Sequence, residues 1–587
     1  MTALDLTGPP PGPGVDAGAL VVVASPTVAR RRVVARTVFA FALVIGCYQT
    51  SLWSLLRGIT VDTPLAFLGL VPAIAGVLAC VLARPASGEP DIHDRMVDRI
   101  VGWPLIAAAL VALVLLPARM STMYWLYRVD LLTMPLFVAG VIALLFGVRM
   151  LWRTKAAVLF LFLAWPVPAQ RLAIAALEPM GDLAASAVGA AVHLIPVAER
   201  TGGDGISFLV PHGAEGFQVQ IASACSGANG LVGFLLVAGA IAITLRGAVV
   251  RKLLWLAAGS GVVVALNVVR IMSILAVGRL FGERAAIDVL HPYVGLLTFN
   301  VGVFVMVLAS GRFGLRPFRR DGERRTRAVL SAVPTLGALV PVLVVVALVG
   351  GAFDHGLTTY DPIASSVGSP RLGSFAQVAT QPDGFYAEPV DTIDAGRRFF
   401  GEDSSWIRYS YLGRGTDGLH SDVPVLADVV STTNLQSFSD FGLEACYRFH
   451  GFDMGGVRRI DLGHGVVGTV LNWQEPDGGL RWTTVYWIWA VRSGDQTRYE
   501  RIVLLLNDVD GARIEAPDVT DAEAPGLGLR ADELVRGGAA GPAISEDQVR
   551  SRSFLVTFAR RVVGSSVERS EQLDHRAGDG TGTGEDG

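Results

Sequence analysis

Residues 253–278 read LLWLAAGSGVVVALNVVRIMSILAVG, an apolar run long enough to cross a bilayer, with Arg270 as its single charged residue. A guanidinium stays charged at any relevant pH and is costly inside a membrane, so it indicates a functional site by default. Asn267 lies one helical turn earlier on the same face and can supply a second hydrogen bond. The run therefore predicts a membrane helix that carries a functional arginine.

Two further polar residues stand at the mouths of the neighbouring apolar runs. Cys225 lies in Ala-Cys-Ser-Gly, where the position before a helix favours the reactive thiolate and Ser226 keeps the turn small. His291 is followed by Pro292, a pattern typical of an N-cap with proline at the first helical position. Its imidazole can exchange protons with a thiol, and Asp288 can orient the ring.

Each of these residues, taken alone, also has an interpretation without a catalytic role. Cys225 alone fits a buried structural cysteine, His291 a capping histidine, and Arg270 a side chain that snorkels to the headgroups. Together they comprise a nucleophile, a cation and a base on three consecutive apolar runs. We therefore predict covalent catalysis at one side of a membrane.

The composition supports a multi-pass membrane protein. Of 587 residues, 51% are hydrophobic and 17% charged, and the mean hydropathy is +0.48. A net charge of −3 argues against nucleic acid as a partner. The remaining cysteines, Cys47, Cys80 and Cys446, form no CxxC pair with each other or with Cys225. We therefore expect no metal site and no cofactor.

Hydropathy predicts an all-α bundle of about nine transmembrane helices, near 37–56, 64–83, 103–118, 131–148, 156–172, 224–245, 253–278, 293–311 and 329–351. The stretch 173–219 fits no simple span and is interpreted as a re-entrant or interfacial helix, with two short spans as the alternative. Clusters of arginine between alternate runs predict the cytoplasmic side. Cys225, Arg270 and His291 then all lie toward the outer leaflet of a plasma membrane, with Arg270 about 12 Å deep.

At these residues the chain resembles the exosortase/archaeosortase family. The resemblance rests on residues 224–227 (ACSG), 267–271 (NVVRI) and 291–295 (HPYVG), in that order on successive helices. It implies a membrane cysteine transpeptidase or protease that cleaves C-terminal sorting tails of exported proteins through a thioester on Cys225. An amine, or a lipid or glycan acceptor, would then release the protein onto a surface anchor. It also implies that Arg270 and His291 are catalytic.

A different kind of sequence follows Gly351. Alternating apolar and polar residues over 466–473 and 480–491, around Glu-Pro-Asp-Gly-Gly at 475–479, predict a β-hairpin, and 498–506 predicts a third strand. We expect a small soluble α+β domain with an antiparallel sheet. It resembles, loosely, an exosortase-associated domain linked to exopolysaccharide assembly. Cys446 with His450 or His420 is a second candidate Cys–His pair, although a buried cysteine beside surface histidines fits as well.

The predicted organisation has four parts: a disordered cytoplasmic N-terminus over 1–33, a transmembrane domain over 34–351, an extracytoplasmic domain over 352–564 and a disordered tail over 565–587. Two other functions stay open. A transporter for polysaccharide or lipid would use Arg270 as a binding charge, and an envelope-assembly scaffold would use the outer domain as its working part.

Overall fold

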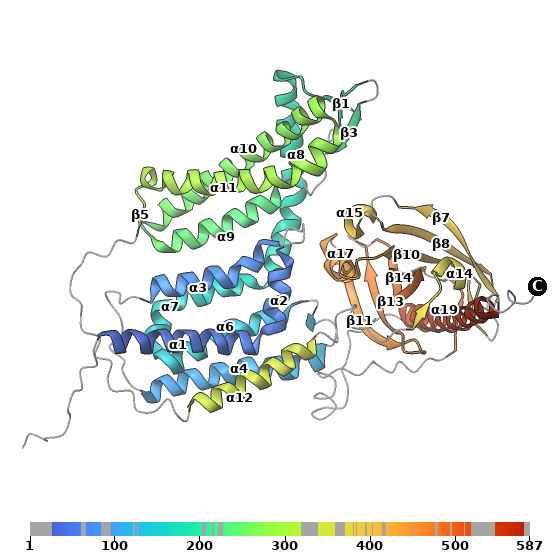
Figure 1. The fold of residues 1–587 in the computed structure, drawn as a ribbon, viewed down its shortest axis with the longest axis horizontal. Coiled ribbons are helices and arrows are strands. Elements are labelled where there is room, and N and C mark those ends of the chain that lie inside the picture. Colours follow the sequence, from blue (N-terminus) through green and yellow to red (C-terminus); the bar gives the residue numbers. More distant parts are fainter. Residues whose placement is uncertain are drawn as a thin grey trace, which may run out of the picture.

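The computed structural model describes residues 26–59, 66–83, 95–120, 124–125, 127–201, 207–213, 216–220, 227–317, 339–357, 370–379, 381–382, 384–393, 396–401, 403–413, 418–450, 452–475, 479–493, 496–509, 511–517 and 546–579. The chain forms a helical part up to residue 357 and a β-rich part from residue 370 (Figure 1). The helices of the first part lie in two groups.

The first helix group contains the N-terminal helices and, from much later in the chain, α12 (Figure 1). Its members are α1 (Pro26–Cys47), α2 (Gln49–Gly58), the 3₁₀ turn η1 (Ala66–Leu70), α3 (Val71–Leu82), α4 (Arg95–Met120), α6 (Val129–Phe146), α7 (Val148–Leu161), η2 (Phe162–Ala164) and α12 (Leu339–Gly356). Their shared core is almost entirely aliphatic and aromatic, as a bundle in an apolar solvent requires.

Polar side chains from α12 hold a bend in the first apolar run. Helices α1 and α2 meet at 86°. At the bend, the fully buried Asp354 of α12 accepts hydrogen bonds from the backbone N–H groups of Thr50 (2.7 Å) and Ser51 (3.1 Å) and from the Ser51 hydroxyl. These are N–H groups of the first turn of α2, which have no partner within the helix. Asp354 therefore caps α2 from a distant part of the chain.

A second buried carboxylate lies at the start of α6. Asp130, fully buried, takes two hydrogen bonds from Arg128, at 3.1 Å from Nε and 2.8 Å from Nη2. The same Nη2 donates to the Ser54 hydroxyl of α2 at 2.9 Å. This ion pair ties the start of α6 to α2, and such forked pairing satisfies a charge that would otherwise be costly to bury.

The second helix group carries the predicted site residues. It contains α8 (Pro166–Leu194), α9 (Ala228–Thr244), α10 (Val249–Phe281), the π-helical turn η4 (Ala285–Leu290), α11 (His291–Ala309) and η5 (Ser310–Phe313). Between α8 and α9 lies an antiparallel sheet of β1 (Glu199–Thr201), β2 (Ser207–Val210) and β3 (Phe217–Gln220). Its buried Phe208 and Val210 share a core with α8 and α10, so the sheet is fixed on the helices.

The prediction of nine spans is not confirmed. Among the described residues, five helices are long and apolar enough to cross a bilayer, and the bent pair α1–α2 makes a sixth candidate. The run predicted over 156–172 is broken after Leu161, because a 3₁₀ turn and Pro166 begin a new helix there. The stretch 173–219 is neither purely re-entrant nor two short spans, because α8 continues to Leu194 and the β1–β3 sheet follows.

Basic residues gather at one end of the helices, opposite the end where α11 begins. Strand β4 (Leu245–Arg246) pairs with β5 (Arg316–Pro317), which brings the α9–α10 connection beside the chain after α11. At the same end Arg153 of α7 donates to the Ala83 carbonyl at 3.2 Å. Arg246 and Arg316, from two of the arginine clusters predicted to share one side, therefore lie side by side, in the connections drawn at β5 in Figure 1.

The C-terminal part is built on one antiparallel sheet, with strand order β11-β12-β13-β14-β10-β8-β7 and β6 added parallel to β13. The strands are β6 (Arg371–Leu372), β7 (Phe385–Thr392), β8 (Ser405–Gly413), β10 (Val425–Thr432), β11 (Asp453–Asp461), β12 (Val467–Gln474), β13 (Arg481–Ser493) and β14 (Gln496–Asn507). A small separate sheet pairs β9 (His420–Ser421) with β15 (Ile514–Glu515). The predicted hairpin is confirmed as β12–β13, and the predicted third strand as β14.

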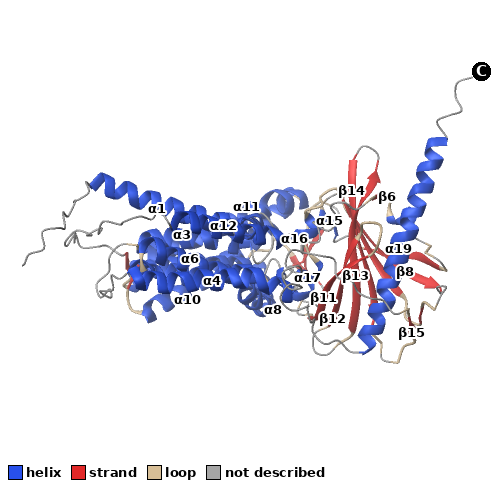
Figure 2. Cartoon of the chain, turned by 90° about the horizontal axis from the view of Figure 1, so that it is seen from below, coloured by secondary structure: helices blue, strands red, loops and turns tan. Residues whose placement is uncertain are grey.

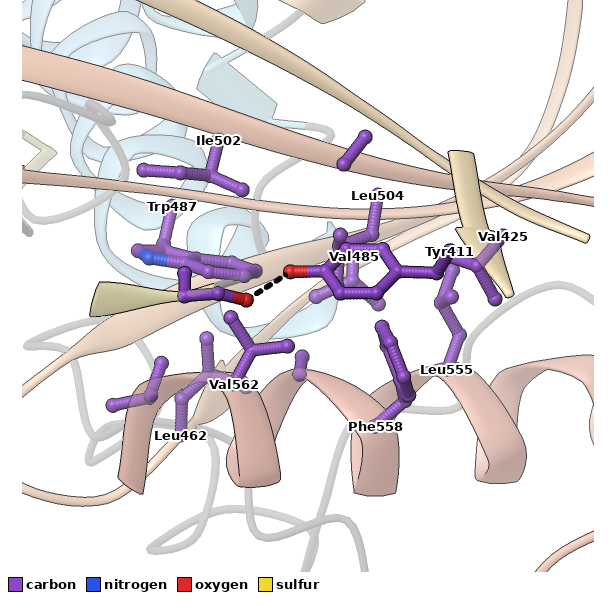
Figure 3. Packing of buried hydrophobic residues seen from close by; sticks show 14 of the residues in the cluster. Tyr411, Val425, Leu462, Val485, Trp487, Ile502, Leu504, Leu555, Phe558 and Val562 are labelled. Carbon is purple, nitrogen blue, oxygen red and sulfur yellow. Dashed lines mark hydrogen bonds between the residues drawn. The ribbon is translucent and has the colours of Figure 1, made fainter. Parts of the chain in front are cut away.

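One face of this sheet is covered by the long helix α19 (Glu546–Asp579), and the other by short helices including α16 (Ser437–Asp440) and α17 (Leu443–Phe449) (Figure 2). Phe558 and Val562 of α19 pack under Tyr411 and Trp487, and the Tyr411 hydroxyl donates to the Ala379 carbonyl at 2.6 Å (Figure 3). Burial of this face supplies the main apolar core of the sheet. The α16–α17 face is turned toward the helical part and α19 away from it (Figures 1 and 2).

Two predicted disordered segments are shorter than expected. Helix α1 begins at Pro26, inside the segment predicted over 1–33, and residues 1–25 lie outside the described part. Helix α19 continues to Asp579, so the prediction of a disordered tail from Ser565 is wrong up to that residue. Ser566 and Ser570 are buried there, and their hydroxyls donate to carbonyls one turn earlier. A polar composition therefore hid a packed helix.

Candidate active site

Arg270 and His291, which lie on two different helices, are in direct contact. Nη2 of Arg270 on α10 lies 3.0 Å from Nε2 of His291, the first residue of α11. Arginine has only donors, so His291 Nε2 is the acceptor and the ring proton is on Nδ1. The structure thus brings these two predicted site residues into contact.

The guanidinium of Arg270 lies over a glycine of the neighbouring helix. A Cβ built on Gly295 of α11 would be 3.4–3.5 Å from Cζ, Nε and Nη2 of Arg270. Nε is buried and has no hydrogen-bond partner among the described residues. A planar cation packed on bare backbone, with one buried donor directed at no described acceptor, is suited to receive an oxygen of a ligand.

Asn267 connects this pair to the segment that carries Cys225. It is 7% exposed, and its side chain lies against Gly227, where an added Cβ would be 2.7 Å from the Asn267 Cγ. Gly227 has a φ of 83° and is the N-cap of α9. Only glycine adopts that conformation readily and also leaves room for the amide. The residue after Ser226 is therefore fixed against α10, one helical turn from Arg270.

Cys225 and Ser226 themselves lie outside the described residues. Their neighbours on both sides are described: β3 ends at Gln220, paired with Ser207, and α9 starts at Ala228. The left-handed Gly227, and not Cys225, occupies the N-cap position of α9.

His291 is not an N-cap, contrary to prediction. The π-helical turn η4 runs directly into α11, and the backbone of His291 is helical, with φ −53° and ψ −45°. Asp288 lies on this π-turn, and its side chain is outside the description. π-Turns are often found at functional sites because the wide turn re-aims the residues that follow. Here the turn rotates His291 toward α10.

The length of α10 changes the expected depth of Arg270. The helix has 33 residues and is about 50 Å long, well beyond a hydrocarbon core of about 30 Å. Arg270 lies about 32 Å along the axis from Val249, which begins the helix at the basic end. If Val249 lies at a membrane interface, the distance from it to Arg270 is about the thickness of the hydrocarbon core. The remaining turns lie beside the β1–β3 sheet.

The second candidate pair, Cys446 with His450, lacks the features of a reactive site. The two residues lie one turn apart on and just after α17, and the backbone N–H of His450 donates to the Cys446 carbonyl. Burial raises the pKa of the Cys446 thiol, which disfavours the thiolate. The other histidine, His420, bonds Asp422 at 2.8 Å. Within the described residues no three His, Cys, Asp or Glu side chains gather closely enough to hold a metal ion.

A family model described as transmembrane exosortase matches residues 62–308. This match supports the predicted resemblance of residues 62–308 to the exosortase family. The matched exosortase segment includes Cys225, Arg270 and His291, and it ends before α12 and the C-terminal sheet. No curated protein and no solved structure matched the chain in the other two comparisons.

Two glycines of the exosortase segment were not predicted as site residues. Gly295 makes room for the guanidinium of Arg270, and its place four residues after His291 puts it on the same helix face. Gly227 lies with its bare backbone against the Asn267 side chain. In both cases the sequence signal was a glycine within one helical turn of a polar residue.

Proposed function

We propose that this chain is a membrane cysteine transpeptidase or protease, acting on C-terminal sorting tails of exported proteins, with Cys225 as nucleophile and Arg270 and His291 as its partners. One observation carries the proposal: the 3.0 Å hydrogen bond between Arg270 and His291, formed by residues from separate membrane helices. The family of residues 62–308 supports the same class of reaction.

Covalent geometry supports Cys225 as the third member. Cys225 stands two positions before Gly227, so covalent geometry limits the distance between their Cα atoms to about 7 Å. Gly227 contacts Asn267, and Arg270 is about 4.5 Å further along the axis of α10. These short distances support Cys225 as the third member of the site.

The Arg270–His291 bond also implies an order of events. While Arg270 donates to Nε2, that nitrogen is unable to accept the thiol proton. A substrate carbonyl that enters over Gly295 attracts the guanidinium as negative charge develops on its oxygen, because the cation stabilises that charge in a site without water. Nε2 is then released to act as the base. Catalytic competence is coupled in this way to the presence of substrate.

The proposed reaction passes through a thioester on Cys225. Nε2 takes the Cys225 proton, the sulfur attacks the scissile carbonyl carbon, and Arg270 stabilises the oxyanion. The intermediate collapses to a thioester, and the departing amine takes the proton from Nε2. An acceptor amine then attacks the thioester and gives its proton to His291, which returns it to the leaving thiolate. Water in place of the amine gives hydrolysis.

We assign the site to the outer leaflet of the plasma membrane, since the basic end of the helices matches the cytoplasmic side. The C-terminal domain would then be extracytoplasmic, after α12. Its α16–α17 face is turned toward the helical part (Figure 2), which suits a role in docking exported proteins. The acceptor is an amine or an amine-bearing lipid or glycan.

The test is processing of a co-produced envelope protein with a C-terminal tail, in membranes holding the full-length chain. Cys225→Ala, His291→Ala and Arg270→Lys should each leave the tail uncleaved, Arg270→Lys because a point charge does not reproduce a guanidinium fork. Cys80→Ala, which removes an exposed thiol of α3, should process normally.

Two results oppose the proposal. Normal cleavage by Cys225→Ala would exclude a thioester. Loss of polysaccharide export in the same variant, with cleavage intact, would favour the transporter or scaffold. Mass spectrometry of Cys225 after brief turnover should find an acyl adduct that hydroxylamine removes, as a thioester requires.

A further inference from the structure

Phe67 of the first helix group contacts two helices of the second helix group, α9 and α11. Its ring stacks on Phe299 of α11, with centroids 5.0 Å apart and planes inclined by 30°. On its other side lies Gly233 of α9, where an added Cβ would be 2.7–2.8 Å from three ring carbons. The phenyl ring therefore touches both α9 and α11 and fills the room left by a glycine.

The backbone of Phe67 is held firmly in the first helix group. Phe67 belongs to η1, whose next residue, Leu68, is 2% exposed. A Cβ at Gly69 would collide with the Leu55 carbonyl oxygen of α2, so η1 and α2 are in close contact. Asp354 in turn caps α2. The ring projects from a braced support.

We propose that Phe67 is a positioning residue for the exosortase centre, which sets the spacing between α9, after Cys225, and α11, which begins at His291. This inference rests on the function proposed above. Gly233 lies about 9 Å along α9 from Gly227, and Phe299 about 12 Å along α11 from His291. Loss of the ring at this depth lets the two helices close on each other and moves their outer ends.

The expected size follows from the geometry of catalysis, in which a misplacement of about 1 Å costs on the order of 100-fold. Phe67→Ala should lower processing about 10- to 100-fold. Phe67→Leu, which keeps most of the side-chain volume, should retain most of the wild-type processing rate. Gly233→Ala adds a methyl group that clashes with the Phe67 ring, so it should also impair processing. Gly233→Ala combined with Phe67→Ala should be no worse than Phe67→Ala alone.

The decisive readout is the pH dependence of alkylation at Cys225 by iodoacetamide, resolved by peptide mass spectrometry on full-length protein in nanodiscs. It requires no knowledge of the substrate. In Phe67→Ala the alkylation rate at neutral pH should fall about tenfold and the midpoint should move toward that of an ordinary thiol, about pH 8.5. Phe146→Ala, which removes another half-buried ring from the same core near the basic end, should leave the midpoint unchanged.

Failure of this inference is distinguishable from failure of the proposed function. If Cys225→Ala and His291→Ala abolish processing of the tail while Phe67→Ala leaves the alkylation profile and processing unchanged, the positioning role is wrong and the function stands. If Cys225→Ala processes the tail normally, the proposed function is wrong. Strictly additive effects of Phe67→Ala and Gly233→Ala would also refute the role, since residues in contact couple by about 0.5–3 kcal/mol.

Discussion

Asp354 gives the sharpest stability test, because one carboxylate accepts three hydrogen bonds at the start of α2. Asp354→Ala leaves two backbone N–H groups and the Ser51 hydroxyl buried without that acceptor. Each orphaned donor costs about 1–3 kcal/mol, or about 3–9 kcal/mol together. Removal of a buried charge returns several kcal/mol. The net expected loss is about 2–4 kcal/mol.

Asp354→Asn separates shape from charge. It keeps one acceptor oxygen in the same place, so it should lose only about 1–2 kcal/mol. The assay is thermal unfolding of the helical part of the full-length protein in nanodiscs, with a fall of about 5–10 °C for Asp354→Ala. Val345→Ala, on a 58% exposed position of the same helix, is the matched control and should change little.

Two outcomes would refute this reasoning. Equal melting temperatures for the wild type and Asp354→Ala would mean that the bend between α1 and α2 needs no cap. A more stable Asp354→Ala would mean that desolvation of the carboxylate outweighs its hydrogen bonds.

Three further predictions concern packing and pH. Gly295→Ala should process normally, since its methyl reaches only van der Waals contact with Arg270, whereas Gly295→Leu should displace the guanidinium and abolish processing. Gly351→Ala places a Cβ against the Gly46 carbonyl oxygen and should lower the melting temperature of the helical part by several degrees, whereas Gly261→Ala meets nothing within 4 Å and should not. The C-terminal sheet should lose stability above about pH 10, followed by tryptophan fluorescence. Burial raises the pKa of Tyr411, Tyr447 and Tyr486, so near pH 10 these tyrosines ionise only in the unfolded state. Each then lowers the free energy of unfolding by up to about 1.4 kcal/mol per pH unit. Tyr→Phe at any of the three should raise the pH at which the sheet unfolds.

The site was predictable because its chemistry is local in sequence. An arginine in an apolar run and a His-Pro pair are visible without a structure, and their spacing on successive helices brings them together. The spans were less predictable. Hydropathy counts apolar residues but does not show that Asp354, about 300 positions later, bends the first run at Tyr48.

The errors in the C-terminal part have a different cause. Residues 565–579 look like a polar tail, yet serine hydroxyls satisfied within the helix can face a sheet. Phe554, Phe558 and Val562 recur at a four-residue spacing, which predicts a helix that buries one side. Beyond Ser565 the same face continues with Ser566 and Ser570, whose composition does not distinguish them from exposed polar residues.

The length of α10 has a consequence for where along a substrate the proposed enzyme would cleave. The helix is about 20 Å longer than the hydrocarbon core, and in the orientation proposed above Arg270 would stand close to the boundary between lipid tails and headgroups. A client anchored by its own tail helix can offer only the peptide bond that floats at that level. The number of residues between a client's scissile bond and its apolar anchor helix would then determine the cleavage position more than any side chain does.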